Sequence, residues 1–381
     1  MKKLHCGILI SLFVLLSSCS EEQLITPSGN SIKIGVIGPM SGAEKILGED
    51  SLEGIRTALH MSPYLDNGDT LELIVEDDQN EPELTIKAFK KLVTTDKAAA
   101  VIVLSSSASA LAVHKIADQY QVPVLVLLAS HPGITRDSRF VSQLCFDNTF
   151  QGKVAALFVR DELLIDRVAV FINPDSFHSN SLAQAFISKF RSIEGQITDA
   201  IFISGKKYDY QAILSRLREQ NVEFLYLPMA VENVLELSEE LRKMNWTPEV
   251  MTGDGILSSA LALQQGKPHQ LDGFLTIELY SNTIKATAYG KQIRDVFRSL
   301  FETRNSTYPV IGFEGMAILM HAMNRCHDPA ESECINSRLQ NTVDFEGYMG
   351  NITIQANGKT LRPLIVNRIQ GNKLELVVKV Y

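Results

Sequence analysis

The sequence predicts an α/β protein with two doubly wound parallel-sheet lobes, and three observations lead to this fold class. The chain has 381 residues, which is enough for two or three domain-sized units. Its short apolar runs are continuous, as in parallel strands that are covered on both faces. These runs alternate with helix-length segments, and the alternation occurs twice along the chain.

The first unit begins near Ile32 and contains four apolar runs of strand length. They span residues 33–38, 71–76, 99–104 and 122–128. Between the last two runs, Val113, Ile116, Ala117 and Tyr120 are spaced at i, i+3, i+4 and i+7. This spacing predicts a helix over 107–120 with one apolar stripe that packs on the sheet.

A second unit follows a boundary near 145–152, after which a new helix is expected to begin. Its expected strands span residues 167–172, 199–204, 223–228 and 249–253. Helical patterns from about 285 to 342 and a strand-rich tail from 351 to 380 complete the chain. The tail contains a turn signal, "ANGKT" at 356–360.

The N-terminus has the pattern of an export signal. Lys2 and Lys3 precede the apolar run "GILISLFVLL", which is too short for a permanent membrane span. The following "LSSC" resembles the lipobox of bacterial lipoproteins, so residues 1–18 are the expected signal peptide and Cys19 is the expected lipidated residue. The alternative is an ordinary cleaved signal peptide followed by a chance cysteine. Residues 19–30 are polar with Pro and Gly, and they are the expected tether.

Charge and cysteine content limit the partners. The net charge of −8 becomes −10 without residues 1–18, which contain Lys2 and Lys3 and no acid, so nucleic acid is not an expected partner. Cys145 stands alone, whereas Cys326 and Cys334 flank a short loop. In an exported protein, Cys326 and Cys334 are expected to form a disulfide and not a metal site, because His327 is the only nearby nitrogen ligand.

From Ile32 to Val380 the sequence resembles the type I periplasmic binding proteins, in the branch that binds leucine, isoleucine and valine for ABC transporters. The resemblance lies in the order and spacing of several segments. These are "IKIGVIGPMSGAEKILGEDSLEGIRTAL", "LELIVEDDQNEPELTIKAFKKLV", "SSSASA", "VPVLVLLASHP", "FDNTFQGK", "NVEFLYLP" and "DFEGYMGNITIQANGKTLRPLIV".

The resemblance implies two lobes joined by a hinge of three crossings, with the ligand in the cleft between them. Carried over to this chain, the first lobe comprises residues 31–148 and 278–358. The second lobe comprises residues 149–277 and 359–381.

The resemblance also implies site residues. Ser105 matches the position that holds the ligand carboxylate, Leu128 the position of a backbone carbonyl, and Ser130 that of a second hydroxyl. Asp254 matches the acid that pairs with the ligand ammonium group. Without the resemblance, the alternative is that Ser105, Ser106 and Ser107 only cap a helix N-terminus and that Asp254 is part of an Asp-Gly turn.

Other positions depart from the family pattern. The aromatic residue that closes over the ligand is replaced by His178, or by Phe177 in a shifted alignment, and His178 could contact a ligand, sense pH or simply cap a helix. The remaining departures are Ala230 or Val231 for a tyrosine, Leu47 for an aromatic residue, Tyr308 as a possible late aromatic, and Asn80 with Leu104 in place of a disulfide found in some members. The side-chain pocket is therefore rebuilt, and leucine specificity does not transfer.

Function follows as an expectation. The chain is expected to be a lipid-anchored solute-binding protein in the cell envelope, facing the periplasm or the exterior, that captures an amino-acid-like ligand for ABC permease subunits. The alternative is a sensing or envelope-regulating lipoprotein with the same fold. No enzyme, cofactor or metal site is expected, because nucleophile-elbow, zinc-protease and phosphate-loop motifs are absent from the sequence.

Overall fold

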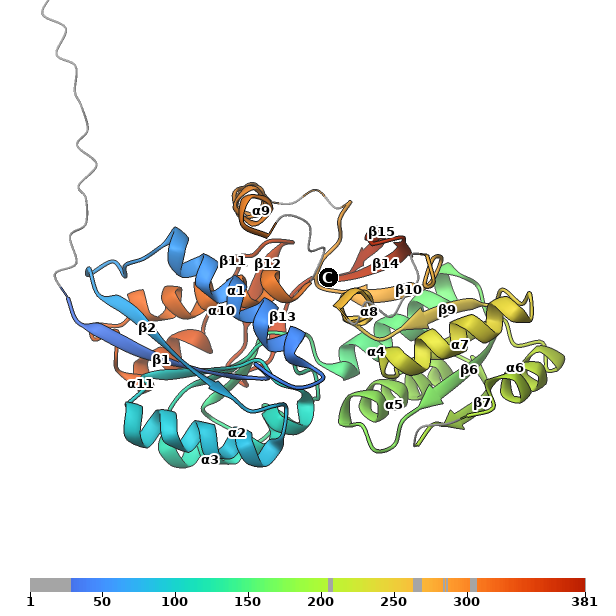
Figure 1. Ribbon diagram of the computed structural model, residues 1–381, viewed down its shortest axis with the longest axis horizontal. Helices are drawn as coiled ribbons and strands as arrows, with labels where there is room; N and C mark the ends of the chain where they lie inside the picture. The colour runs from blue at the N-terminus through green and yellow to red at the C-terminus, as the bar shows by residue number, and fades with distance from the viewer. Residues whose placement is uncertain are drawn as a thin grey trace, which may run out of the picture.

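The computed structural model describes residues 29–204, 208–262, 269–283, 285, 287–301 and 307–380. The expected signal peptide, Cys19 and nearly all of the expected tether lie outside these residues. Figure 1 shows two α/β lobes side by side, with the C-terminus between them. Among the helices described, none combines the length and the apolar character needed to cross a membrane.

The first lobe is built on a five-stranded parallel sheet of order β2-β1-β3-β4-β5. Its strands are β1 (Ser31–Gly38), β2 (Thr70–Asp77), β3 (Ala100–Val103), β4 (Val124–Val126) and β5 (Val141–Gln143). In β3, Ala100 and Ile102 belong to one hydrophobic cluster, whereas Val101 and Val103 belong to another. Both faces of the sheet are therefore covered, as the continuous apolar runs predict.

Helices cover this sheet, and two of them pack through glycines. The helices of this lobe are α1 (Lys45–Met61), α2 (Pro82–Lys91) with its π-helical extension (Leu92–Asp96), α3 (Ser107–Tyr120), α10 (Thr307–Asn324) and α11 (Ser332–Leu339). A Cβ on Gly54 of α1 would lie 2.0 Å from the carbonyl oxygen of Pro309, and one on Gly312 of α10 would lie 2.0 Å from that of Ser51. Glycine lets the two backbones meet at this distance, and the contact fixes the start of α10, which carries Tyr308.

The second lobe has a seven-stranded mixed sheet of order β15-β14-β10-β9-β8-β6-β7. Its strands are β6 (Arg167–Ile172), β7 (Gln196–Phe202), β8 (Phe224–Leu227), β9 (Glu249–Thr252), β10 (Leu275–Glu278), β14 (Leu364–Gln370) and β15 (Lys373–Val380). The five strands from β6 to β10 are parallel, and β14 and β15 add an antiparallel edge. The parallel part repeats the strand order of the first lobe, so the prediction of two doubly wound units is confirmed.

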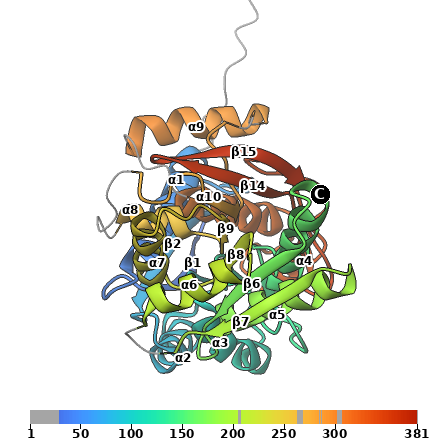
Figure 2. The same ribbon diagram turned by 90° about the vertical axis from the view of Figure 1, so that its right-hand side faces the viewer.

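Helices lie on both faces of the second sheet. They are α4 (Asn148–Leu157) with its π-helical extension (Phe158–Glu162), α5 (Phe177–Ser192), α6 (Tyr210–Glu219), α7 (Val231–Lys243) and α8 (Ile256–Ala262). Figure 2 shows α4 and α5 on one side of the strands and α6 and α7 on the other. Val168 and Val170 of β6 accordingly pack in one cluster, and Ala169 and Phe171 in another.

The chain crosses between the lobes three times. It passes from β5 to α4, from β10 to α9 (Ala288–Phe301), and from β13 (Thr360–Leu361) to β14. β13 pairs with β12 (Asn351–Ile354), which also pairs with β11 (Phe345–Glu346) in a small sheet. These pairings place the crossings within a few residues of the lobe boundaries that the resemblance implies, and the boundaries themselves remain a prediction.

The described residues contain one disulfide and one free cysteine. Cys326 and Cys334 form a disulfide, as their spacing in an exported chain predicts. Cys145 is buried with a free thiol, and burial raises its pKa well above the usual range. The thiol is therefore protonated and unreactive at neutral pH.

Candidate ligand-binding site between the lobes

A cavity of about 190 Å³ lies between the two lobes. It is lined by all six residues that the resemblance implies for ligand contacts: Ser105, Leu128, Ser130, His178, Asp254 and Tyr308. Ser105, Ser130 and Asp254 each lie just beyond the carboxyl end of a parallel strand. Loops at these strand ends form the ligand crevice in open parallel sheets.

On the first lobe, Ser105 is fully buried and its hydroxyl donates a hydrogen bond of 2.5 Å to Oδ2 of Asp78. Thr85 donates to the same oxygen at 2.8 Å. The hydroxyl hydrogen of Ser105 therefore points to Asp78, and a lone pair of Oγ is left for the cavity. For Ser105 to donate to a ligand carboxylate, as the resemblance implies, its hydroxyl must first rotate.

Other donors stand next to Ser105. Ser106 and Ser107 line the cavity where α3 begins, and no side chain caps this helix end. The first backbone N–H groups of an α-helix have no carbonyl partner within the helix, and they carry the positive end of the helix dipole. This end of the cavity therefore favours an anionic group.

Asn80 stands at a position where the resemblance implies a disulfide in some family members, and it makes hydrogen bonds there instead. Its Oδ1 accepts a hydrogen bond of 2.8 Å from the backbone N–H of Ser106, and its Nδ2 donates to Glu44. The loop after β2 is thereby tied to the start of α3 without sulfur chemistry. The segment of Ser105 and Ser106 before α3 is therefore held in place by hydrogen bonds, although the cysteine pair is absent.

On the second lobe, Asp254 lies between Gly253 and Gly255, two positions where a side chain would have little room. A Cβ on Gly253 would lie 3.2 Å from Nε2 of His178, and one on Gly255, which has φ of +73°, would lie 2.8 Å from the Tyr308 hydroxyl. Oδ1 of Asp254 is buried and has no hydrogen-bond partner. A buried carboxylate oxygen without a donor is costly, and a ligand N–H group would remove this cost.

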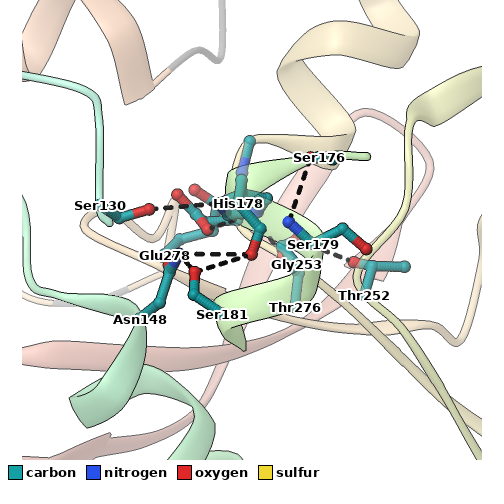
Figure 3. A network of polar contacts seen from close by, with 12 residues as sticks. Ser130, Asn148, Ser176, His178, Ser179, Ser181, Thr252, Gly253, Thr276 and Glu278 are labelled. Carbon is teal, nitrogen blue, oxygen red and sulfur yellow. Dashed lines mark hydrogen bonds and ion pairs between the residues drawn. The ribbon is translucent and has the colours of Figure 1, made fainter. Parts of the chain in front are cut away.

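His178 connects the lobes across the cavity. Its Nδ1 lies 3.2 Å from Oγ of Ser130 on the first lobe. Figure 3 shows this contact as a dashed line. Nε2 of His178 lies 3.6 Å from Oδ1 of Asp254, beyond hydrogen-bond range but close enough for ion pairing when the ring is protonated. His178, at the start of α5, therefore occupies space between the two polar ends of the cavity.

The apolar lining also differs from the family pattern. Leu47, which replaces an aromatic residue, lines the cavity. Leu128, which matches the family, and Ile311 of α10 line it as well. Of the two residues that the resemblance offers for the closing position, His178 lines the cavity, whereas Phe177 is 53% exposed and packs edge-on against His131. Ala230 and Val231 are absent from the cavity lining.

Glu278 lines the cavity, although the sequence alone did not point to it. Its Oε1 accepts hydrogen bonds from the Gly255 backbone at 2.7 Å and from Thr276 at 3.3 Å, and its Oε2 accepts from Thr307 at 3.1 Å. Burial and the nearby charge of Asp254 raise the pKa of Glu278 to about 8. Because Thr307 starts α10 of the first lobe, Glu278 ties the Asp254 loop to the opposite lobe.

Glu278 makes stability depend on pH. Its pKa in the folded protein is above the usual value of 4.5, so between these two values the folded chain holds a proton that the unfolded chain releases. Stability should therefore fall as pH rises from about 5 to 8, and each pKa unit corresponds to about 1.4 kcal/mol. We expect Glu278→Gln to flatten this slope in urea denaturation at pH 5 and pH 8. If the stability of Glu278→Gln fell with pH as steeply as that of the unmodified protein, Glu278 would not be the cause of the pH dependence.

Acidic side chains outnumber basic ones around the cavity, although Glu278, whose pKa is raised to about 8, is largely protonated at neutral pH. Asp254 and Glu278 line it together with His178, and its described lining contains no lysine or arginine. Burial raises the pKa of nearby Glu44, and the charges of Glu232 and Asp78 add to this shift. Within the described ranges, no group of three His, Cys, Asp or Glu side chains is placed to hold a metal ion.

Two α/β lobes, joined by three crossings around a polar cavity, define a hinged ligand-binding protein. The chain belongs to the periplasmic binding protein family, whose model matches residues 31–373. Periplasmic binding proteins are extracytoplasmic solute-binding proteins, which places this chain in that class.

Individual relatives agree with this assignment. An amino acid binding protein of Pseudomonas aeruginosa is 24% identical over 338 residues, covering 86% of this chain and 88% of the relative. The crystal structure of a leucine binding protein from Thermotoga maritima superposes with a TM-score of 0.83 at 25% identity, covering 92% of this chain and 98% of the other. A branched-chain amino acid transporter substrate binding protein from Streptococcus pneumoniae, in complex with isoleucine, superposes with a TM-score of 0.82 at 22% identity, covering 91% and 99%.

Proposed function

We propose that this chain is a lipid-anchored solute-binding protein that captures a small amino-acid-like ligand between its lobes for an ABC importer. The observation that carries the proposal is the polarity of the cavity. One end offers the start of α3 with its serines, and the other end offers the unpartnered Oδ1 of Asp254. A zwitterion with a carboxylate and an ammonium group complements both ends.

The size and the charge of the cavity narrow the ligand class. A volume of about 190 Å³ is below the roughly 300–1,000 Å³ that is typical of sites for drug-sized molecules, so the ligand is a single small molecule. The acidic lining disfavours a plain carboxylate, because such a ligand would leave Asp254 unpartnered beside a second negative charge.

Ligand binding favours the closed arrangement of the lobes in this proposal. The carboxylate contacts the first lobe at Ser130 and the start of α3, and the ammonium group contacts Asp254 of the second lobe. Both ends of the ligand are bound only when the lobes are close together, so the ligand stabilises that state. His178 lies near both Ser130 and Asp254. Its ring either orients the ligand or moves aside when the ligand binds.

A thermal-shift screen against amino acids and small carboxylates tests the ligand class. A ligand at 100 times its dissociation constant stabilises the folded state by about 2.7 kcal/mol, which is easily measured. Stabilisation by one or a few amino acids is the expected result. Stabilisation by plain carboxylates alone would overturn the zwitterion proposal while leaving the family assignment intact.

The anchor is tested separately, because Cys19 lies outside the described residues. We expect Cys19→Ser to abolish membrane association without changing the stability of the folded lobes, since the lipid is attached to the sulfur of Cys19 and the tether separates it from the fold. Fractionation of cells that express each form measures this. Firm membrane association of the variant would contradict lipid anchoring at Cys19.

A further inference from the structure

A second and larger cavity, of about 790 Å³, lies beside the hinge. Residues from all three crossing regions line it, including Asp147, Thr287 and Arg362. Asn351 of the first lobe and Lys379 of the second also line it, and Cys145 is shared with the cavity between the lobes. A volume in the range of about 300–1,000 Å³ is typical of small-molecule sites.

Arg362 in this lining has hydrogen-bonding capacity that the protein does not use. Its side chain is 2% exposed, and Nη2 donates to Oε2 of Glu314 at 2.8 Å. Nε and Nη1 are buried and have no hydrogen-bond partner. Buried guanidinium nitrogens are almost always hydrogen-bonded in native proteins, so two without a partner on a residue that lines the cavity indicate a missing acceptor within reach of this side chain.

Two lysines add donors to the same cavity. Lys379 donates to the carbonyl oxygen of Met349 at 2.7 Å, and Lys359 pairs with Asp147 at 2.7 Å. The remaining acid of the lining, Asp344, is exposed at the surface, so solvent and salt screen its charge. The lining thus has three basic side chains, Lys359, Arg362 and Lys379, against two acidic ones, Asp147 and Asp344.

We propose that this hinge cavity binds a small molecule through a phosphate or carboxylate group, at a site separate from the cavity between the lobes. A planar or tetrahedral oxyanion suits the fork of guanidinium N–H groups and the neighbouring ammonium groups. Because residues of both lobes line the cavity, its occupant contacts both lobes and biases their relative arrangement.

Calorimetric titration of the purified protein tests the proposal, with inorganic phosphate and acetate as separate probes at constant ionic strength set with chloride. Arg362→Lys keeps the charge beside Glu314 but removes the fork of donors, and Lys379→Met removes one ammonium group. The matched control is Lys373→Met, because Lys373 is an exposed residue of the same strand outside the cavity lining.

We expect saturable binding of at least one probe, weakened about tenfold or more in both lining variants and unchanged in the control. Binding of phosphate alone identifies a phosphorylated ligand, and binding of acetate alone identifies a carboxylate ligand. If neither probe saturates, or if binding survives in both lining variants, the proposal is wrong. Thermal unfolding checks that Arg362→Lys folds, and Lys379→Met carries the test if it does not.

Discussion

Replacing Glu314 with glutamine is expected to destabilise the protein by about 3–5 kcal/mol, because it leaves the charge of Arg362 buried without a counter-charge. Glu314 is 1% exposed and accepts two hydrogen bonds, from Arg362 at 2.8 Å and from the backbone N–H of Tyr348 at 2.7 Å. It therefore joins α10 to the third crossing and to the loop before β12. Urea denaturation measures the effect.

Glu239→Gln is the matched control. Glu239 also pairs with a base, Lys243 at 3.6 Å, but both side chains are more than half exposed. Exposed pairs contribute only about 0–1 kcal/mol. Similar losses in the two variants would show that the buried pair contributes little to folding.

Asp254→Asn is expected to weaken the binding of an amino acid by tenfold or more. The substitution keeps the size of the side chain but loses the charge-assisted partner of the ammonium group, at a cost of about 1.5–3 kcal/mol. For a plain carboxylate the same substitution should be neutral or favourable, because it removes a negative charge that would face the ligand carboxylate. Calorimetry with the ligands found by the screen measures both affinities.

Asp199→Asn serves as the control, because Asp199 forms a surface pair with Arg216 at 2.6 Å and is absent from the lining of the cavity between the lobes. Its affinity for each ligand should match that of the unmodified protein. Unchanged amino-acid affinity in Asp254→Asn would make Asp254 a turn residue and not the ammonium partner.

Local sequence patterns predict much of the fold because parallel strands that are buried on both faces need continuous apolar runs. The run at 99–104 contains β3, and the run at 167–172 coincides with β6. β7 begins at Gln196, three residues before the expected start, and β5 and β10 were not predicted. β5 has only three residues, so its apolar pattern is too short to distinguish from a loop.

The candidate site was predictable where a resemblance supplied the residue, and not where only the tertiary structure brings groups together. Ser105 was expected, but its bond to Asp78 joins two segments that lie 27 residues apart. Glu278 ends an apolar run like many surface acids, and nothing local indicates that Thr307 and Gly255 donate to it. The choice between His178 and Phe177 likewise depended on which face of α5 meets the cavity.

The order of strands in the second sheet bears on how the chain folds after export. β14 and β15 close this sheet next to β10, yet they are the last strands in the part of the chain that the structure describes, and α10 and α11 of the first lobe precede them. Neither lobe is contiguous in sequence, so vectorial folding, in which one lobe is completed before the other emerges, is not available to this protein. Truncation after residue 363 should therefore damage the middle of the molecule and not merely its end, because it exposes the edge of β10 that β14 covers.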